Sequence, residues 1–452
     1  MTTSMQTTGR AASSSLNPAR VYAKVSRRIM PFLIVAFIVA FLDRINIGFA
    51  QFQMKADIGI SDSVYGLAAG IFFIGYVLFE VPSNLLLHKI GARRTFSRIM
   101  ICWGIVSVGM AFVTNSTTLF VLRFLLGAFE AGFFPGIILY LSYWYPARYR
   151  AARTSWIFAA MASAGVVGGV AAGTIMSLMD SLFALRGWQW LFIVEGLPAI
   201  ILGFIALYWL TDNPERATWL SRDERDYVME ELDRDRTGRD TEEVSTLRGA
   251  MRNPLLYLMC FVYFTLCSVT MALNFWLPTL VKETGVRSLT HTGLLVALPY
   301  VIGVVAIIYV ARTSDRLRER RLHYVFSTTV GCAALVTLAL TSPGVAGTLI
   351  LLSIAVAGTF SALPVFWSIP HEYLSRNAAA GGLALISSVG QLGSFFSPAL
   401  IGWTRTATGG HMQPALLSIA MLSLIGAASV YLYMTPRRRV DIPMSRANTF
   451  EG

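Results

Sequence analysis

The chain has 452 residues, of which 55% are hydrophobic and only 14% are charged, whereas an average soluble protein carries about 25% charged residues. This composition excludes an ordinary water-soluble globule. The length leaves room for roughly a dozen apolar helices of about 20 residues, each long enough to cross a bilayer core of about 30 Å. The net charge of +12 would indicate nucleic-acid binding only if the basic residues gathered on one solvated face.

Twelve apolar runs, separated by Gly, Pro and clusters of charge, follow a polar and basic segment that we do not expect to be a cleaved signal peptide. In the first half of the chain the predicted helices span 29–52, 65–87, 97–113, 118–144, 155–178 and 188–211. In the second half they span 254–281, 291–312, 323–341, 347–370, 379–403 and 412–434.

These runs predict an all-α membrane protein whose twelve transmembrane helices form two pseudo-symmetric six-helix bundles. We divide the chain into a disordered basic tail over 1–28, an N-terminal bundle over 29–211, a charged cytoplasmic linker over 212–252, a C-terminal bundle over 253–435 and a tail over 436–452. The linker is expected to be a solvated amphipathic helix that tethers the bundles, and docking of the linker to regulate transport is the minority interpretation.

The Lys and Arg residues indicate the orientation of the chain. Thirty of the 37 fall in segments that lie on one side of the membrane if the N-terminus is cytoplasmic, and basic loops mark the cytoplasmic side. Both termini are therefore predicted to be cytoplasmic. The excess of positive charge indicates the topology of the chain, and we expect no nucleic-acid partner. We expect a monomer in the plasma membrane, which is the inner membrane in a Gram-negative cell.

An internal repeat is visible in the loops that follow the second helix of each half. Residues 88–94 carry Arg93 and Arg94, and residues 315–321 carry Asp315 and Arg316. Transporters are commonly built from such repeats, so we expect two halves in parallel orientation and assign these four side chains a gating or structural role.

Four ionisable side chains lie inside the first and fourth predicted helices: Asp43, Arg44, Arg123 and Glu130. A charge near the bilayer centre costs a few kcal/mol, so each should face a cavity or find a partner. A rise of about 1.5 Å per residue places Asp43 and Arg123 at one depth and Glu130 near the midplane. We predict that Asp43 pairs with Arg123 and that Arg44 turns into a cavity, where its planar fork can bind a carboxylate.

A coupling of anion and proton follows from this pairing. An anion bound to Arg44 or Arg123 weakens the hold of that arginine on Asp43 and so raises the proton affinity of the Asp43 carboxylate. We therefore predict Asp43, Glu130 and Arg123 as proton-coupling residues, with Arg44 and Arg123 as substrate-binding residues. A purely architectural charge network remains the alternative interpretation.

Five segments resemble a known family. They are FLDRINIGFA (41–50), GYVLFEVPSNLLL (75–87), LRFLLGAFEAGFFPG (122–136), GWQWLFIVEGLP (187–198) and FWLPTLVKE (275–283). Together with the basic loops they resemble the anion:cation symporter family of the major facilitator superfamily. Its members take up organic anions such as tartrate, sugar acids, phthalate and hydroxyphenylacetate with protons. The resemblance implies the same proton carriers on the first and fourth helices.

The remaining candidates line the expected central site. The resemblance adds Tyr76, Trp367, Ser368 and Gln391 as substrate-binding residues. Asn274 is a further candidate because it precedes the helix break at a proline, and broken helices commonly line transporter sites. In the fifth helix, small residues that include Gly165 and Gly169 predict a close packing seam between helices.

The function that we expect is proton-coupled uptake of a small organic anion, such as a hydroxy acid, a sugar acid or an aromatic carboxylate. The alternative within the same fold is an exporter or antiporter of organic acids or drugs. A membrane-embedded enzyme would need a catalytic constellation that the sequence does not contain. No cofactor or metal site is indicated, because the His and Cys residues lack ligand spacing; the proton gradient would supply the energy.

Overall fold

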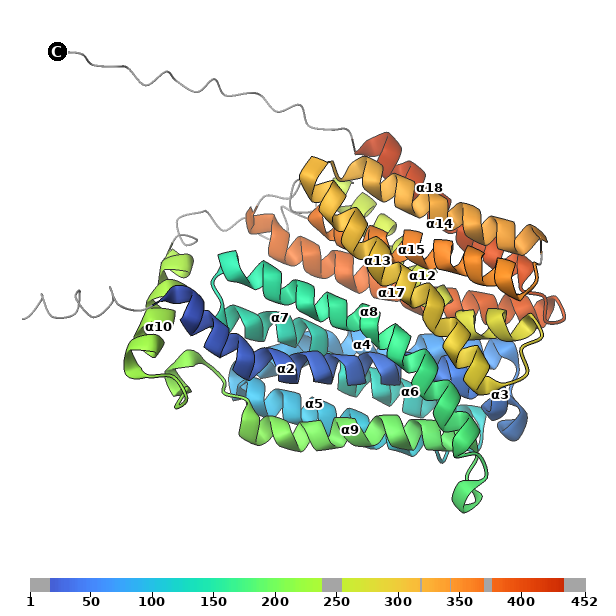
Figure 1. The fold of residues 1–452 in the computed structure, drawn as a ribbon, viewed down its shortest axis with the longest axis horizontal. Coiled ribbons are helices and arrows are strands. Elements are labelled where there is room, and N and C mark those ends of the chain that lie inside the picture. Colours follow the sequence, from blue (N-terminus) through green and yellow to red (C-terminus); the bar gives the residue numbers. More distant parts are fainter. Residues whose placement is uncertain (1–16, 238–253, 318, 342, 370–375, 435–452) are drawn as a thin grey trace, which may run out of the picture.

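The computed structural model describes residues 17–237, 254–317, 319–341, 343–369 and 376–434, and these residues form a bundle of long helices (Figure 1). The first half contains α2 (Pro18–Ile45), α3 (Ile47–Ile58), α4 (Asp62–Ile90), α5 (Ala92–Met110), α6 (Ser116–Glu130), α7 (Phe133–Trp144), α8 (Ala147–Leu178), the 3-10 turn η1 (Leu182–Ala184) and α9 (Gly187–Trp209). The connecting region contains the 3-10 turn η2 (Pro214–Arg216) and α10 (Arg222–Thr237). The second half contains α12 (Pro254–Glu283), α13 (Leu289–Leu317), α14 (Arg321–Thr341), α15 (Val345–Ser368), α17 (Arg376–Ala407) and α18 (Gln413–Tyr433).

Within these described residues, 11 helical segments are long and apolar enough to cross a membrane, with α2–α3 and α6–α7 each counted as one. Helix α5 is not among them, because Arg93, Arg94 and Arg98 occupy its first two turns. Its 19 residues nevertheless measure about 28 Å at 1.5 Å per residue, and it packs along α9 and α6. The chain is thus an all-helical protein with many membrane-spanning helices.

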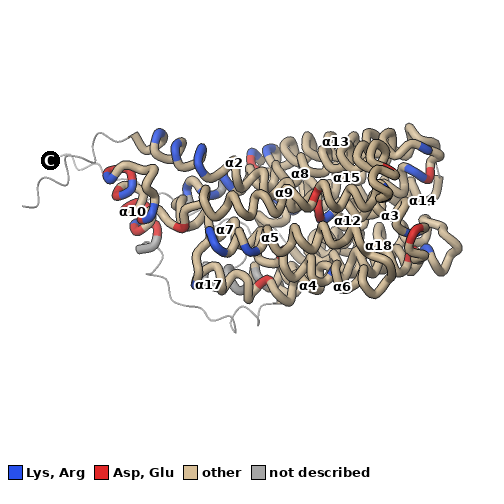
Figure 2. Tube along the Cα trace, turned by 90° about the horizontal axis from the view of Figure 1, so that it is seen from below, with Lys and Arg blue, Asp and Glu red and all other residues tan. Residues whose placement is uncertain are grey.

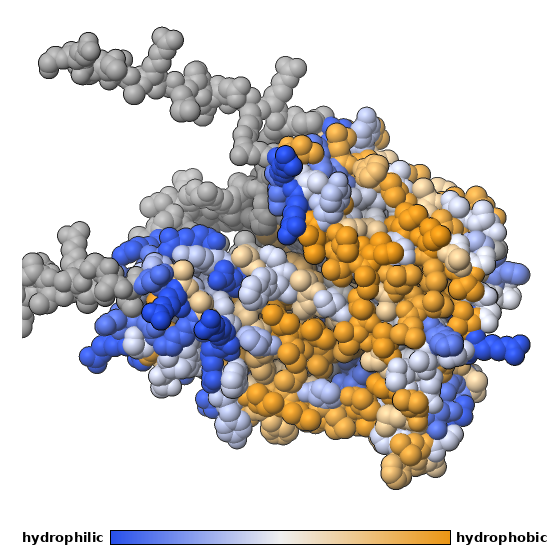
Figure 3. Space-filling model, viewed as in Figure 1, coloured by the Kyte–Doolittle hydropathy of each residue, from blue (hydrophilic) through white to orange (hydrophobic). Residues whose placement is uncertain are grey.

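The surface has the belt that a lipid environment requires. Charged residues gather toward the two ends of the helices and are sparse between them (Figure 2). Hydrophobic residues cover the middle of the face shown in Figure 3. Large apolar side chains such as Phe204, Val305 and Phe326 are exposed on helices of both halves, which is favourable only where lipid replaces water.

Helix α2 begins at Pro18, well before the predicted start at residue 29 and inside the segment predicted to be a disordered tail. The reason is local. The Asn17 side chain accepts a hydrogen bond from the Ala19 N–H at 3.0 Å, and a proline at the first helical position is already in a helical conformation. The basic residues of this segment therefore form an extra helical extension at the end of α2.

The predicted helix over 118–144 is divided into α6 and α7 by Ala131 and Gly132. Gly132 has a φ of +83°, and a side chain there would lie 2.6 Å from Ser83 Oγ on α4. Glycine is therefore required for both conformation and space. The break places Glu130 at the last position of α6, next to backbone that leaves the helix.

The two halves meet along two pairs of helices, α4 with α17 and α8 with α13. Close approach is possible because glycines face backbone: a Cβ at Gly66 would lie 2.2 Å from Pro398 O, and a Cβ at Gly293 would lie 2.2 Å from Gly169 O. These contacts lie toward the end of the molecule where α4 and α13 begin. We call this the closed end, and the opposite end, where α10 packs, the linker end (Figure 1).

The first part of the linker is docked on the first half. Lys24 of α2 contacts Glu224 of α10 at 2.6 Å, and Arg148 of α8 pairs with Glu231. Trp144 stacks on Trp219 with ring centroids 5.4 Å apart. The prediction of a solvated tether therefore applies poorly to α10, because Val228 and Leu232, which are interleaved with its charges, are buried.

Candidate functional site

An ion pair inside the first half forms the centre of the candidate site. Arg44, in the next-to-last position of α2, donates from Nη2 to Oε1 of Glu130 at the end of α6. The Glu130 side chain is only 1% exposed and that of Arg44 is 16% exposed. The pair therefore satisfies a buried charge, and Arg44 is its more accessible member.

Two aromatic residues of α4 surround this pair. The Arg44 guanidinium carbon lies 5.3 Å from the ring centroids of both Phe72 and Tyr76. The guanidinium carbon of Arg123 lies 5.1 Å from the same Phe72 ring. The Phe72 ring thus lies near two cations, and the negative faces of aromatic rings stabilise positive charge. Sequence reasoning missed Phe72, which looks like any other apolar residue of its helix.

The predicted ion pair between Asp43 and Arg123 is not among the ion pairs of the described residues. Asp43 Oδ1 instead accepts hydrogen bonds from Ser107 Oγ and from Asn46 Nδ2, the latter at 3.2 Å. Arg123 donates to the backbone carbonyls of Ala68 and Ala69, at 3.2 and 3.4 Å. The prediction that these two charges neutralise each other by direct contact is therefore wrong.

The physical reason is the close packing of α4 on α6. A Cβ at Gly127 would lie 1.9 Å from Phe72 O, and a Cβ at Gly75 would lie 2.3 Å from Phe124 O, so these glycines bring the two backbones together. The fully buried Arg123 side chain then meets carbonyl oxygens of α4 before it can reach α2. Glycine spacing alone does not predict which carbonyls an arginine will meet.

The second half contributes a polar pair and an aromatic cluster. Asn274 of α12 is buried, and its Oδ1 accepts a hydrogen bond from the Tyr300 hydroxyl of α13 at 2.7 Å. Trp367 of α15 packs edge-on against Tyr263 of α12 with ring centroids 4.9 Å apart, and Tyr263 stacks on Phe366 at the same distance. Tyr263 and Tyr300 were not predicted, although each is a tyrosine within an apolar helix.

Two other predicted substrate-binding residues, Ser368 and Gln391, lie near the aromatic cluster of the second half. The Ser368 hydroxyl donates to Pro364 O of its own helix at 3.1 Å. Gln391 of α17 is half-buried and follows Gly390, at which a Cβ would lie 2.2 Å from the Tyr263 ring. Gln391 therefore lies in a helix segment that is in contact with the aromatic cluster.

The predicted packing seam is present at Gly165 and Gly169 of α8. A Cβ at Gly165 would lie 2.6 Å from the Tyr300 ring, and one at Gly169 would lie 2.8 Å from Gly293 O. The two glycines therefore lie at the contact between the halves. Any movement of one half against the other must change this contact.

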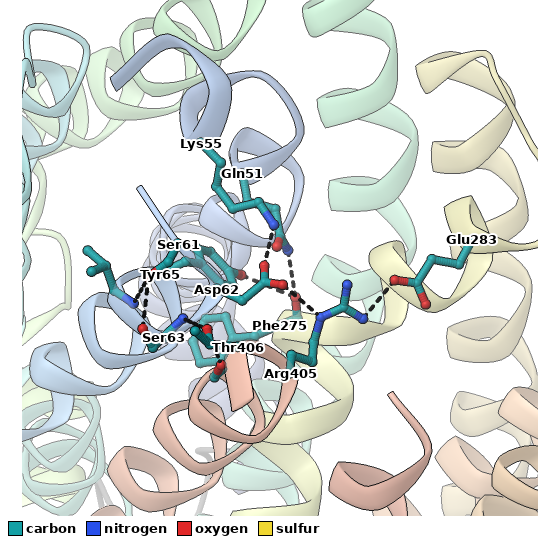
Figure 4. A network of polar contacts seen from close by, with 12 residues as sticks. Gln51, Lys55, Ser61, Asp62, Ser63, Tyr65, Phe275, Glu283, Arg405 and Thr406 are labelled. Carbon is teal, nitrogen blue, oxygen red and sulfur yellow. Dashed lines mark hydrogen bonds and ion pairs between the residues drawn. The ribbon is translucent and has the colours of Figure 1, made fainter. Parts of the chain in front are cut away.

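The closed end carries a chain of ion pairs that crosses between the halves (Figure 4). Arg405 of α17 donates from Nε to Asp62 of α4 at 3.0 Å and from Nη1 contacts Glu283 of α12 at 2.7 Å. Lys55 of α3 also pairs with Asp62. Tyr65 donates from its hydroxyl to Phe275 O at 3.2 Å. These charged residues, which lie near helix ends, were not singled out from the sequence.

The basic loops lie at the linker end. Arg93 and Arg94 are exposed at the start of α5, where the Arg93 N–H donates to Asp212 at 2.9 Å. Asp315 pairs with Arg320 of its own loop at 2.6 Å, and Arg316 is exposed. The contacts found for these side chains stay within one half, so their gating role remains a prediction.

A metal site is not formed by these residues: among the described parts of the chain, no group of three His, Cys, Asp or Glu residues lies close enough to hold an ion. The chemistry that the site offers is electrostatic. It presents a guanidinium with aromatic flanks that is paired with a buried carboxylate.

Comparison of the sequence with known proteins finds a family match and several relatives. The family model of the Major Facilitator Superfamily matches residues 32–398. Two proteins of Agrobacterium vitis, each named "Putative tartrate transporter", are 44% identical to this chain over 90% of it and cover 90% and 93% of their own lengths. A quinolone resistance transporter of Acinetobacter baumannii is 38% identical over 91% of this chain and 94% of its own length.

A solved structure has the same fold. The crystal structure of a bacterial homologue of the human lysosomal transporter Spinster superimposes with a TM-score of 0.75. The match covers 92% of this chain and 97% of that one at 16% identity.

Proposed function

The chain belongs to the major facilitator superfamily, and we propose that it carries a small organic anion together with protons across the membrane by alternating access. As a member of this superfamily it is a multi-pass membrane transporter and not an enzyme. The observation that carries the proposal is the buried ion pair between Arg44 and Glu130. The pair supplies a guanidinium that can bind an anion once its one carboxyl partner, which can be protonated, no longer occupies it.

The coupling works by exchange of carboxylates. A substrate carboxylate that binds Arg44 takes the place of Glu130 and can form two parallel hydrogen bonds with the guanidinium. The displaced Glu130 is almost fully buried, and Arg44 is its only ion-pair partner among the described residues. A buried carboxylate without a cation is strongly unfavourable, so Glu130 takes a proton from water. The loaded site thus holds one carboxylate and one added proton, with no change in net charge.

The substrate class follows from the same groups. Arg44 and Arg123 supply positive charge close to the Phe72 ring, and Tyr76 adds an aromatic face with a hydroxyl. Such a lining suits a small carboxylic acid that carries hydroxyl groups or a ring. The tartrate transport named for the relatives at 44% identity supports a hydroxy acid such as tartrate as the first compound to test. Trp367, Ser368, Gln391 and Asn274 are proposed to contact it from the second half.

The arrangement in the membrane is part of the proposal. We assign α5 as a further span, which gives six spans in each half, and place both termini and α10 on the cytoplasmic side because basic residues gather there. The closed end then faces outward, and the site is reached from the cytoplasm. Opening of the closed end, with closure at the linker end, completes the transport cycle.

The test is transport by the purified protein in proteoliposomes. With the outside acidic, radiolabelled tartrate should accumulate above its external concentration, and collapse of the pH gradient by a proton carrier should abolish that accumulation. A panel of sugar acids, aromatic acids and organic cations should separate the classes by thermal stabilisation, because a ligand at 100 times its Kd stabilises the folded state by about 2.7 kcal/mol. Stabilisation by cations and by no carboxylate would refute the proposal.

A second candidate is export of organic acids or drugs by proton antiport. The identity of 38% with the quinolone resistance transporter is the observation that favours it. The direction of the effective gradient separates the two functions. Symport accumulates substrate in vesicles when the outside is acidic, whereas antiport accumulates it only when the inside is acidic.

A further inference from the structure

A third carboxyl, that of Glu195, is buried within the first half and takes no part in the mechanism above. Glu195 lies in α9, and the residue is 6% exposed. The neighbouring Gly196 brings α9 against α5: a Cβ at Gly196 would lie 3.0 Å from Val108 N and 3.1 Å from Gly104 O. Glu195 is therefore at the level of Ser107, the residue whose hydroxyl donates to Asp43.

Asn46 lies beside both carboxyls. It donates from Nδ2 to Asp43 Oδ1, and both Asn46 and Asp43 lie near enough to the Glu195 carboxyl to interact with it. One oxygen of each carboxyl, Oδ2 of Asp43 and Oε2 of Glu195, is buried without a hydrogen-bond partner among the described residues. The two carboxyls are thus neighbours with unused acceptor capacity.

The surrounding cations are already engaged or distant. On α2, Arg44 pairs with Glu130. On α6, Arg123 donates to carbonyls of α4, although both Glu130 and Arg123 remain within electrostatic range of Asp43. The other helices packed on α9 carry their charges toward their ends, with Arg98 on α5, Arg153 on α8 and Lys55 on α3. Neither carboxyl has an ion-pair partner among the described residues.

Two adjacent carboxylates without a paired cation cannot both be ionised at low cost in an apolar environment. We propose that Glu195 and Asp43 form a second proton-binding site, separate from the pair of Arg44 and Glu130, with Asn46 as the positioning residue. A proton from water adds to a carboxylate oxygen of the pair and returns to water when that O–H bond breaks. Its part in driving uptake rests on the proposed function, whereas proton binding itself does not.

The test compares Glu195→Gln with Glu230→Gln, a matched change at a solvent-exposed carboxyl of α10. Infrared difference spectra of the purified protein between pH 5 and pH 9 should show the C=O stretch of a protonated carboxyl in the wild type and in Glu230→Gln. Glu195→Gln should lose part of that band, and the midpoint of the remaining titration should move by roughly one pH unit toward acid, because a like charge has been removed.

A second variant keeps the test valid if Glu195→Gln does not fold. In Asp43→Asn the Glu195 band should remain and its midpoint should move in the same direction. An unchanged pH titration in whichever of the two variants folds would overturn the inference. Failure of the proposed function looks different: wild-type vesicles would show no uptake driven by the pH gradient, while the infrared titration of the carboxyl pair could still be present.

Discussion

Removal of Arg405 should open the closed end. Its side chain is 8% exposed and joins Asp62 of the first half, at 3.0 Å, to Glu283 of the second, at 2.7 Å. Breaking a buried ion pair by removal of one partner costs about 3–5 kcal/mol. Here Asp62 keeps Lys55, and Glu283 is 43% exposed to solvent. We therefore expect Arg405→Ala to destabilise the closed arrangement by about 1–3 kcal/mol, a change of about 5-fold to 150-fold in the equilibrium.

The assay is a distance measurement between spin labels on the two halves. Ala56 of α3 and His411, which follows α17, are both exposed at the closed end and can be changed to Cys after replacement of the four native cysteines. The wild type should give one short distance, and Arg405→Ala should add a longer one. Arg405→Lys should lie between the two, because Lys cannot bridge both acids with a planar fork.

Glu283→Gln is the control for this experiment, since it weakens a contact that lies entirely within the second half. It should leave the distance distribution close to that of the wild type. If Arg405→Ala gives the wild-type distribution under conditions in which substrate or pH changes that distribution, the network does not hold the halves together and the reasoning fails.

Three further predictions concern the seam, the anion site and the docked linker. Gly293→Ala places a Cβ 2.2 Å from Gly169 O and should weaken the closed arrangement in the same spin-label assay, whereas Gly344→Ala, with no atom within 4 Å, should not. Arg44→Lys keeps the charge but loses the planar fork, so the KM for uptake should rise about tenfold or more; an unchanged KM would remove Arg44 from the binding site. Partial burial acts to raise the pKa of Glu224, but hydrogen bonds from Lys24 and the Ser221 N–H outweigh it and hold this pKa below its usual value. The contribution of Glu224 to the docking of α10 is therefore complete above the ordinary Glu pKa of about 4.3, and it is lost as the pH falls through the lowered pKa. Protection of the α10 amides from hydrogen exchange, relative to their intrinsic exchange rates, should therefore fall in acid, and Lys24→Ala should weaken that pH dependence.

Much of the fold could be predicted from the sequence because a helix that crosses lipid needs a continuous apolar run of about 20 residues. Every predicted apolar run corresponds to a helix or to a helix with one break. The predicted and observed helix boundaries differ where a local backbone interaction, which hydrophobicity does not reveal, starts or breaks a helix. The Asn17 cap extends α2, and the positive φ of Gly132 divides the fourth run.

The site was predictable in its residue types and poorly predictable in its pairing. Asp43, Arg44, Arg123 and Glu130 stand out because charge is rare inside apolar helices. Their partners depend on how closely the backbones approach, and Gly127 draws α6 onto α4 so that Arg123 meets carbonyls there. Neutral contributors carry no comparable signal. Ser107, for example, is one hydroxyl among many in apolar helices.

Transport by Glu130→Gln tests the coupling of anion and proton most directly, and exchange of substrate across the membrane must be measured beside accumulation. Gln cannot take up the proton that Glu130 is proposed to bind when substrate displaces it from Arg44. The account predicts that the variant still exchanges labelled for unlabelled anion at equal pH but no longer accumulates it against a concentration gradient when the outside is acidic. Accumulation at the wild-type level, driven by the pH gradient, would contradict the account.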